Sequence, residues 1–438
     1  ALAYNNRGWA TYEYKKDYDR AMADFNQVIK LDPNFALAYI GRGNAYSDKK
    51  DYDRAIADFN QAIKLDPNFA LAYNNRGWAA YKYKKDYDRA MADFNQAIKL
   101  DPNFALAYNN RGWATYEYKK DYDRAMADFN QAIKLDPNFA LAYNNRGWAT
   151  YEYKKDYDRA MADFNQVIKL DPNFALAYIG RGNAYSDKKD YDRAIADFNQ
   201  AIKLDPNFAL AYNNRGWAAY KYKKDYDRAM ADFNQAIKLD PNFALAYNNR
   251  GWAAYDYKKD YDRAMADFNQ AIKLDPNSAL AYNNRGNAYS DKKDYDRAIA
   301  DYNQVIKLDP NSAYAYNNRG YAYSNKKDYD HAIADFNQVI KLDPQAQYYD
   351  SRCEIYNKKG DYDRAIADCD QAIKLNPLAG YAYYNRGIAY KNKGNKDKAQ
   401  ENFKKVLELN DDLESYQKAK KELQELSLLR ILKIYVKN

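Results

Sequence analysis

The sequence predicts an all-α fold, a solenoid of about twelve stacked helical hairpins followed by a C-terminal helix. Two observations predict it. A proline that follows Asp or Asn recurs in steps of 34 or 35 residues, with one step of 33. Between successive prolines, apolar residues recur at helical spacing. Repeats of this length indicate a solenoid, in which each unit packs only on its neighbours, so a 438-residue chain needs no division into globular domains.

One repeat, Ala36 to Asn68, shows why each unit is a hairpin. We expect a first helix from Ala36 to about Lys49 and a second over 52–65, where Ala55, Phe59 and Ala62 fall at helical spacing. The Lys-Lys-Asp sequence between them is a polar turn. Asp66-Pro67-Asn68 ends the second helix, because proline cannot donate a backbone hydrogen bond.

The array occupies residues 1–410, and residues 411–438 form a capping helix. The cap begins as an amphipathic helix and becomes apolar nearly all round from Leu428 to Val436. That apolar segment either packs under the last repeat, which we favour, or meets another chain or a membrane face. Self-association through this helix is therefore one expectation.

Seven positions of the repeat give a more specific prediction. Small and aromatic residues alternate at fixed spacing in Tyr39, Gly43, Tyr46, Ala55, Phe59, Ala62 and Pro67. This pattern resembles the tetratricopeptide repeat family over nearly the whole chain. The resemblance implies a right-handed superhelix that acts as a non-catalytic scaffold and binds other proteins or peptides on its inner face. Arg42 departs from the family's leucine, and we expect it to pair with Asp58 inside the repeat.

Composition excludes several classes of function. There are 69 basic and 61 acidic residues, a net charge of +8, with the signs thoroughly mixed, so nucleic acid is an unlikely partner. No apolar run is long enough to span a bilayer. Cys353 and Cys369 are too few for a disulfide framework. We expect them to be small buried hydrophobic residues near each other, with a redox pair as the remoter alternative, in a protein of a reducing compartment such as the cytoplasm.

No constellation of residues predicts catalysis. His331 is the single histidine, and neither a phosphate-binding loop nor a metal-ligand spacing is present. We therefore expect no enzymatic activity, no cofactor and no metal.

Paired asparagines are the first candidate for a binding site. Leu2, Asn5, Asn6, Trp9 and Tyr12 share one face of the first predicted helix, and the resemblance places this face inside the superhelix. A carboxamide offers a donor and an acceptor, so a row of asparagines can hold an extended peptide backbone. In the alternative interpretation one asparagine of each pair caps or bridges neighbouring helices. The candidates are Asn5, Asn6, Asn74, Asn75, Asn109, Asn110, Asn144, Asn145, Asn213, Asn214, Asn248, Asn249, Asn283, Asn284, Asn317 and Asn318.

Aromatic residues on the same face are the second candidate. All six tryptophans occupy one place in the repeat, where they can serve as anchors with a large contact area. Alternatively, each indole packs on the first helix of the next unit. The tryptophans are Trp9, Trp78, Trp113, Trp148, Trp217 and Trp252, and the tyrosines expected to shape side-chain pockets with them are Tyr12, Tyr81 and Tyr116.

A duplicated block bears on what kind of protein this is. Residues 1–114 are identical to residues 140–253. A binding groove tolerates such copying better than a unique catalytic pocket does. We therefore expect a scaffold that binds extended peptide segments, with self-assembly as the alternative and RNA binding as a weaker one.

Overall fold

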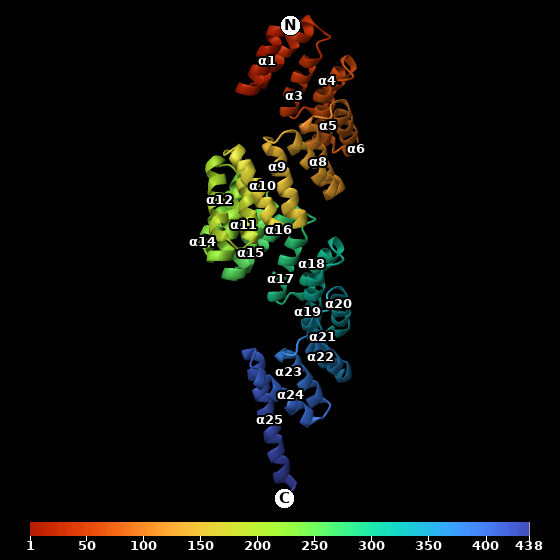
Figure 1. Cartoon of the computed structure of the whole chain (residues 1–438). Helices are drawn as coiled ribbons and strands as arrows, with labels where there is room; N and C mark the ends of the chain where they lie inside the picture. The colour runs from red at the N-terminus through yellow and green to blue at the C-terminus, as the bar shows by residue number, and fades with distance from the viewer. Residues whose placement is uncertain (438) are drawn as a thin grey trace. The chain divides into compact units, whose positions relative to one another are not determined.

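A computed structural model describes the backbone of residues 1–437, and the side chains of all of these except 83, 84, 223 and 428–437. Every regular element in that part of the chain is a helix, so the predicted all-α fold is confirmed (Figure 1). The helices form two compact units, Ala1–Lys224 and Asp225–Asn438.

The first unit consists of helical hairpins in chain order, with three short π-helical segments labelled η. Its elements are α1 (Leu2–Lys15), α2 (Tyr18–Leu31), α3 (Ala36–Asp48), α4 (Tyr52–Leu65), α5 (Ala70–Lys84), α6 (Tyr87–Leu100), α7 (Ala105–Ala114), η1 (Thr115–Lys119), α8 (Tyr122–Leu135), α9 (Ala140–Ala149), η2 (Thr150–Lys154), α10 (Tyr157–Leu170), α11 (Ala175–Asp187), α12 (Tyr191–Leu204), α13 (Ala209–Ala218) and η3 (Ala219–Lys223).

The second unit continues the same alternation and ends in one longer helix. Its elements are α14 (Tyr226–Leu239), α15 (Ala244–Lys258), α16 (Tyr261–Leu274), α17 (Ala279–Asp291), α18 (Tyr295–Leu308), α19 (Ala313–Asn325), α20 (Tyr329–Leu342), α21 (Ala346–Lys359), α22 (Tyr362–Leu375), α23 (Gly380–Asn392), α24 (Lys396–Leu409) and α25 (Leu413–Lys437).

Within each unit the hairpins stack in the order of the chain. Each second helix contacts the first helix of the next hairpin, as α2 contacts α3 and α14 contacts α15. Successive first helices also contact each other, as α5 contacts α7 and α17 contacts α19. This second contact brings the same position of neighbouring repeats together, so a side chain that recurs in the sequence can form a continuous row.

Local sequence sets the ends of the helices. In the Lys-Lys-Asp turn, Lys50 has a left-handed backbone with φ of 62°. The next residue, Asp51, accepts a hydrogen bond from the backbone N–H of Arg54 at 3.3 Å and so caps α4. After α4, Asp66 accepts from the backbone N–H of Asn68 at 3.0 Å and shapes the turn that contains the proline.

The core of each hairpin depends on a glycine and an aromatic ring. Phe59 is 1% exposed and lies against Gly43, where an added Cβ would come within 2.6 Å of the ring. The glycine is therefore required for the two helices to approach this closely. The same contact recurs between Gly112 and Phe129.

Arg42 forms the predicted pair with Asp58, through bonds of 2.6 and 2.8 Å. The guanidinium also donates to Asn26 of the preceding hairpin at 2.7 Å, a contact that the sequence analysis did not predict. One arginine thus links its own hairpin to the one before it. Both partners of the pair are mostly buried, so the pair specifies the register of the helices more than it adds net stability.

The two cysteines correct one expectation. Cys353 and Cys369 are buried and lie close together as predicted, but they are joined by a disulfide, whereas we had expected free thiols. Cys353 takes the place of the hairpin glycine and Cys369 that of the phenylalanine. A covalent bond thus replaces the usual contact, and the cysteine count no longer argues for a reducing compartment.

The C-terminal helix α25 packs on the last hairpin through buried Ser415, Ala419 and Leu426. The side chains of Leu428 to Val436 lie outside the described residues, so self-association through them stays a prediction. The boundary expected between residues 410 and 411 also stays a prediction. None of the helices in the described part of the chain is long and apolar enough to cross a bilayer.

Candidate functional site

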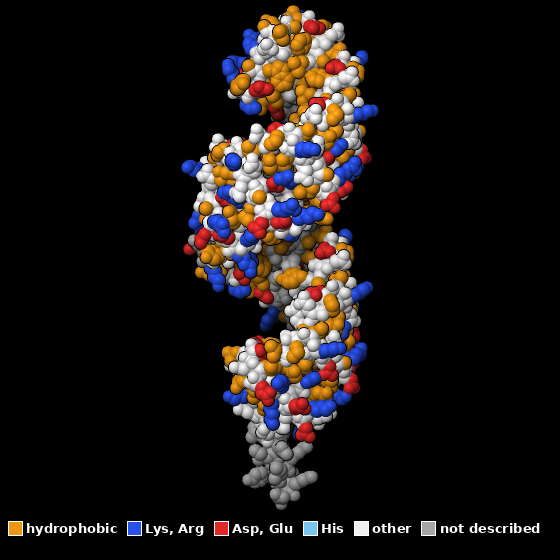
Figure 2. Space-filling model, viewed as in Figure 1, with side chains coloured by type: hydrophobic (Ala, Val, Ile, Leu, Met, Phe, Trp, Pro, Cys, Tyr) orange, Lys and Arg blue, Asp and Glu red, His pale blue; other side chains and the backbone are white. Residues whose placement is uncertain are grey.

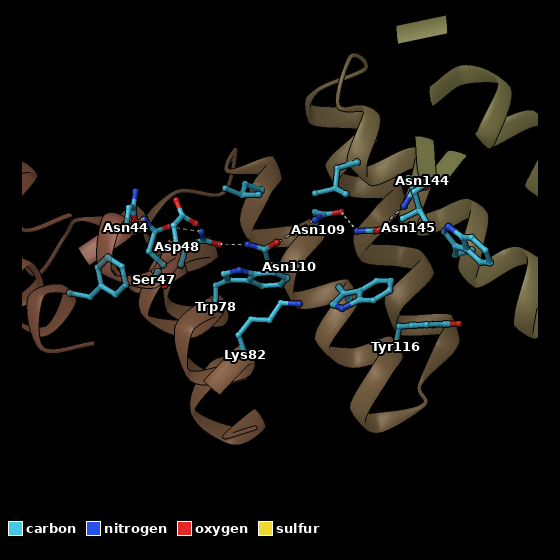
Figure 3. A pocket seen from close by; sticks show the side chains of 18 of the residues that line it. Asn44, Ser47, Asp48, Trp78, Lys82, Asn109, Asn110, Tyr116, Asn144 and Asn145 are labelled. Carbon is cyan, nitrogen blue, oxygen red and sulfur yellow. Dashed lines mark hydrogen bonds between the residues drawn. The ribbon is translucent and has the colours of Figure 1, made fainter. Parts of the chain in front are cut away.

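A hollow of about 670 Å³ lies in the first unit, and its lining comes mainly from first helices of the hairpins, from α1 to α11 (Figure 3). In Figure 3 the labelled asparagines form a row, with Trp78, Lys82 and Tyr116 below them. The predicted residues that line it are Tyr12, Asn74, Asn75, Trp78, Asn109, Asn110, Trp113, Tyr116, Asn144, Asn145 and Trp148. The hollow therefore brings together part of the candidate site.

The other candidates do not line this hollow. Those of the first unit are Asn5, Asn6, Trp9, Tyr81, Asn213, Asn214 and Trp217. Those of the second unit are Asn248, Asn249, Trp252, Asn283, Asn284, Asn317 and Asn318.

The asparagines of the hollow form a ladder of hydrogen bonds to one another. Within a pair, the first asparagine donates to the second, as Asn109 Nδ2 does to Asn110 Oδ1 at 3.3 Å. Between hairpins, the second asparagine donates to the first of the preceding helix, as Asn110 Nδ2 does to Asn74 Oδ1 at 3.0 Å and Asn145 Nδ2 does to Asn109 Oδ1 at 2.9 Å. The bridging role named as the alternative is thus present in the structure.

The ladder limits how the amides can meet a ligand. Asn109 and Asn110 are 1% and 6% exposed. A carboxamide offers two N–H groups and two lone pairs, and the printed bonds of Asn109 use one of each. One N–H and one lone pair of that side chain are left for another partner. Binding of a peptide backbone by these amides stays a prediction.

The tryptophans adopt two orientations. Trp78 stacks on Tyr81 with an angle of 24° between the rings, and Trp113 is tilted on Tyr116 by 35°. The indole N–H of Trp113 also donates to the hydroxyl of Tyr81 at 3.0 Å, across neighbouring hairpins. Trp148 instead meets Tyr151 edge-on, at 86°. Trp78, Trp113 and Trp148 therefore line the hollow, and Trp113 also links neighbouring hairpins.

Tyrosine–carboxylate contacts link the hairpins at the edge of the hollow. The hydroxyl of Tyr12 donates to Asp48 at 2.6 Å, and that of Tyr116 donates to Glu152 of the next hairpin. Burial raises the pKa of Glu152 above its ordinary value, and burial together with the bond to Asp48 raises the pKa of Tyr12. These acids are therefore occupied by tyrosine hydroxyls.

Several lining residues were not among the binding candidates named from the sequence, although Leu2 was placed on the same helix face. Leu106, Leu141 and Leu176 contribute apolar surface, and the ammonium group of Lys82 lies 5.0 Å from the centre of the Trp78 ring. Helical spacing could have found them, because Lys82 follows Trp78 by four residues and the leucines recur three residues before each asparagine pair or its equivalent.

The surface carries both signs of charge. Figure 2 shows Lys and Arg interspersed with Asp and Glu on the face that it draws, without a continuous basic track on that face. The charged residues that line the hollow are Asp48, Lys82 and Glu152. In the described part of the chain, no group of three His, Cys, Asp or Glu side chains is placed to hold a metal ion.

Comparison with family models gives two matches that together cover most of the chain. A model described as tetratricopeptide repeat matches residues 36–69, 175–208, 279–312, 313–345 and 380–413. A model described as TPR repeat matches residues 11–49, 79–118, 115–153, 150–189, 218–257, 253–293 and 354–394. No curated protein matches the sequence at a significant level.

Two solved structures are similar to this chain. One is the crystal structure of the APC/C hetero-tetramer Cut9-Hcn1, with 15% identity, a TM-score of 0.47, and coverage of 96% of this chain and 98% of that one. The other is a tetratricopeptide repeat protein from Parabacteroides merdae, with 21% identity, a TM-score of 0.47, and coverage of 58% and 98%. Because both TM-scores are below 0.5, the family assignment rests on the family models.

Proposed function

The chain belongs to the tetratricopeptide repeat family, whose repeats form protein-interaction scaffolds, and we propose that it holds extended peptide segments of partner proteins in the hollow of its first unit. The observation that carries this proposal is the lining. Three tryptophans, three leucines and a ladder of asparagines line one hollow of about 670 Å³.

The apolar part of the lining supplies the binding energy. Trp78 and Trp113 are partly exposed, and Leu141 is 37% exposed. Indoles offer a large contact area and lose little side-chain entropy on binding, which makes them frequent anchors at interfaces. We therefore expect the bound segment to carry apolar or aromatic side chains.

The repeat spacing sets the register of the bound segment. Packed helices lie roughly 8–10 Å apart, and an extended chain rises about 3.3 Å per residue. Each hairpin would then meet about every third residue of the peptide. The remaining N–H of an amide such as Asn109 can donate to a peptide carbonyl at that interval, although a single bond contributes only about 1 kcal/mol. Affinity therefore depends on several hairpins acting together.

Charge favours a protein partner over nucleic acid. Two acids and one lysine line the hollow, and both acids accept hydrogen bonds from tyrosine. Binding of RNA needs a row of cations along the phosphate backbone. We also infer a non-catalytic role, because the sequence contains no catalytic constellation.

Selection of random peptides on the full chain tests the proposal. We expect the selected peptides to be rich in apolar and aromatic residues, with affinities measurable by fluorescence anisotropy. Trp113→Ala removes an anchor from the hollow and should weaken their binding at least about tenfold.

The matched control is Tyr118→Ala. Tyr118 lies in the same repeat and is 48% exposed, but it stacks on Tyr87 and does not line the hollow. Its replacement should change peptide affinity less than about twofold. If Trp113→Ala binds the selected peptides as tightly as the native chain does, or if both variants weaken binding equally, the hollow is not the binding site.

The redox state of the two cysteines depends on the compartment in which the protein works. The cytoplasm, expected from the sequence, keeps thiols reduced, whereas disulfides persist in oxidising compartments. If the protein is cytoplasmic, as we propose, the disulfide between Cys353 and Cys369 forms only under oxidising conditions.

A further inference from the structure

The asparagine ladder ends inside the hollow, at the first helix α9. The next first helix, α11, carries Ile179 and Gly180 where other repeats carry two asparagines. The bond between hairpins comes from the second asparagine, and glycine has no side chain to donate it. As a result, Asn144 Oδ1 is buried without a hydrogen-bond partner, although Asn144 is only 2% exposed.

The glycine that ends the ladder leaves room for an aromatic ring. A Cβ at Gly180 would come within 2.4 Å of the Phe164 ring, so the ring fills the space beside the glycine. The interruption is therefore part of the fold at this hairpin.

The tryptophan of α9 also differs from the tryptophan one hairpin earlier. Trp148 turns its ring edge-on to Phe164, with centroids 5.6 Å apart and an angle of 70°. Its Nε1 is buried without a partner, whereas Nε1 of Trp113, one hairpin earlier, donates to Tyr81. Asn144 and Trp148 are four residues apart on one helix, so the unpaired acceptor and the unpaired donor share a face.

Both residues line the hollow (Figure 3 labels Asn144). Buried polar atoms without partners are rare in native proteins, and each calls for an explanation. Asn5 Oδ1 and Trp9 Nε1 are unpaired in the same way, next to Ile40 and Gly41 of α3. In both identical blocks, the unpaired asparagine and tryptophan atoms therefore lie one hairpin before the helix that carries Ile-Gly.

We propose that Asn144 and Trp148 form a subsite for one amide group of the bound segment, an inference that rests on the proposed peptide binding. The amide N–H donates to Asn144 Oδ1, and the amide carbonyl accepts from Trp148 Nε1. Both atoms are covered in this conformation. The Trp148 indole therefore has to move before an amide can reach them from the hollow.

Small amides test the subsite on the full chain. The probes are N-methylacetamide, which mimics a backbone amide, acetamide, which mimics an Asn or Gln side chain, and N,N-dimethylacetamide, which has no N–H. The readout is the indole N–H resonance of each tryptophan in the ¹⁵N-labelled protein, assigned by single Trp→Phe substitutions. We expect a saturable shift of the Trp148 resonance with N-methylacetamide or acetamide, and the tighter of the two identifies the source of the amide.

Two comparisons give the expected changes in amide affinity. N,N-dimethylacetamide should bind at least about tenfold more weakly, which corresponds to about 1.4 kcal/mol. Asn144→Leu, which removes the acceptor, should weaken N-methylacetamide to the same extent. The control Tyr118→Ala should leave the response of Trp148 unchanged, because Tyr118 stacks on Tyr87 and does not line the hollow.

The subsite is wrong if the Trp148 resonance moves with none of the probes, or if N,N-dimethylacetamide moves it as effectively as N-methylacetamide. The second comparison needs no variant, so it holds even if Asn144→Leu fails to fold. If the selected peptides lose affinity in Trp113→Ala but no amide shifts the Trp148 resonance, the subsite is wrong and the proposed function stands. If the amides shift the Trp148 resonance but selection yields no binding peptide, the site binds an amide and the proposed peptide binding is wrong.

Discussion

Individual residues can be interpreted by comparing one place across the repeats. The first asparagine of the ladder is replaced by Asp350 in the hairpin that begins with α21. Its Oδ1 accepts from Asn385 Nδ2 at 2.8 Å, so the ladder contact is kept with a carboxyl in place of an amide. Burial, together with the nearby charge of Glu354, raises the pKa of Asp350 to about 6. The ionised form is therefore disfavoured in the folded state.

This pKa predicts a pH dependence of stability. The folded state binds the Asp350 proton more tightly than the unfolded state, so the free energy of unfolding falls as pH rises from about 4 to about 6. Asp350→Asn restores the usual amide and should stabilise the chain by about 1–2 kcal/mol at about pH 7.5, and by much less at about pH 4.5. Urea denaturation at the two pH values measures the difference. Equal effects at both would show that the carboxyl does not titrate in this range.

At the scale of helices and hairpins, small sequence changes act on the contact between repeats. The tryptophan-bearing repeats are one residue longer in the first helix than the others, and in three of these six repeats the extra residue is absorbed as a π-helical turn, in η1, η2 and η3. In the first two, the extension places Tyr118 and Tyr153 against tyrosines of the preceding hairpins, with ring centroids 3.8 and 4.0 Å apart. The inserted residue thus adds a contact between hairpins at the edge of the stack.

The hairpin of α21 and α22 allows the stability contributed by a disulfide to be compared with that of the glycine–phenylalanine contact in other hairpins. Its disulfide joins residues 16 apart, and a loop of this size is worth about 3 kcal/mol in the chain-entropy account. Reduction with dithiothreitol should lower the free energy of unfolding by about this amount. Without reductant, the unfolded chain should show no titratable thiol.

The control for this experiment follows from the repeat itself. Cys353→Gly with Cys369→Phe restores the pair found in the preceding hairpin as Gly320 and Phe336. Dithiothreitol should leave the stability of this double variant unchanged. A native chain that reacts with two thiol-specific labels before reduction would contradict the disulfide.

At the scale of the whole molecule, stability is a sum over neighbouring hairpins. Each of the two compact units has its own series of contacts between adjacent repeats. Because residues 1–114 and 140–253 are identical, a block can be removed without creating a new kind of neighbour.

Removal of residues 115–253 is the corresponding prediction. It joins Ala114 to Ala254 and reproduces the native sequence around Ala253 and Ala254. The shortened chain should fold with unchanged helicity per residue, measured by far-UV circular dichroism. The slope of its unfolding free energy against urea concentration should be about two thirds of the native value, because the slope is proportional to the surface exposed on unfolding. Loss of helicity per residue would show that distant repeats are coupled.

The sequence by itself determined the helical hairpins, their number, the family and the pairing of Arg42 with Asp58. Residue spacings of three, four and about 34 predict these features, because the features depend on contacts that are local in the chain or repeated in every unit. The sequence also placed the asparagines and tryptophans on one helix face.

Only the tertiary structure decided what those side chains contact. Asn110 meets Asn74 across 36 residues, and Trp148 meets Phe164 edge-on whereas Trp113 is bonded to Tyr81. The bond between Cys353 and Cys369 likewise follows from the distance between two helices. Periodicity gives the face on which a residue lies, but its partner on the next hairpin depends on how the two helices pack, and a glycine such as Gly180 removes that partner altogether.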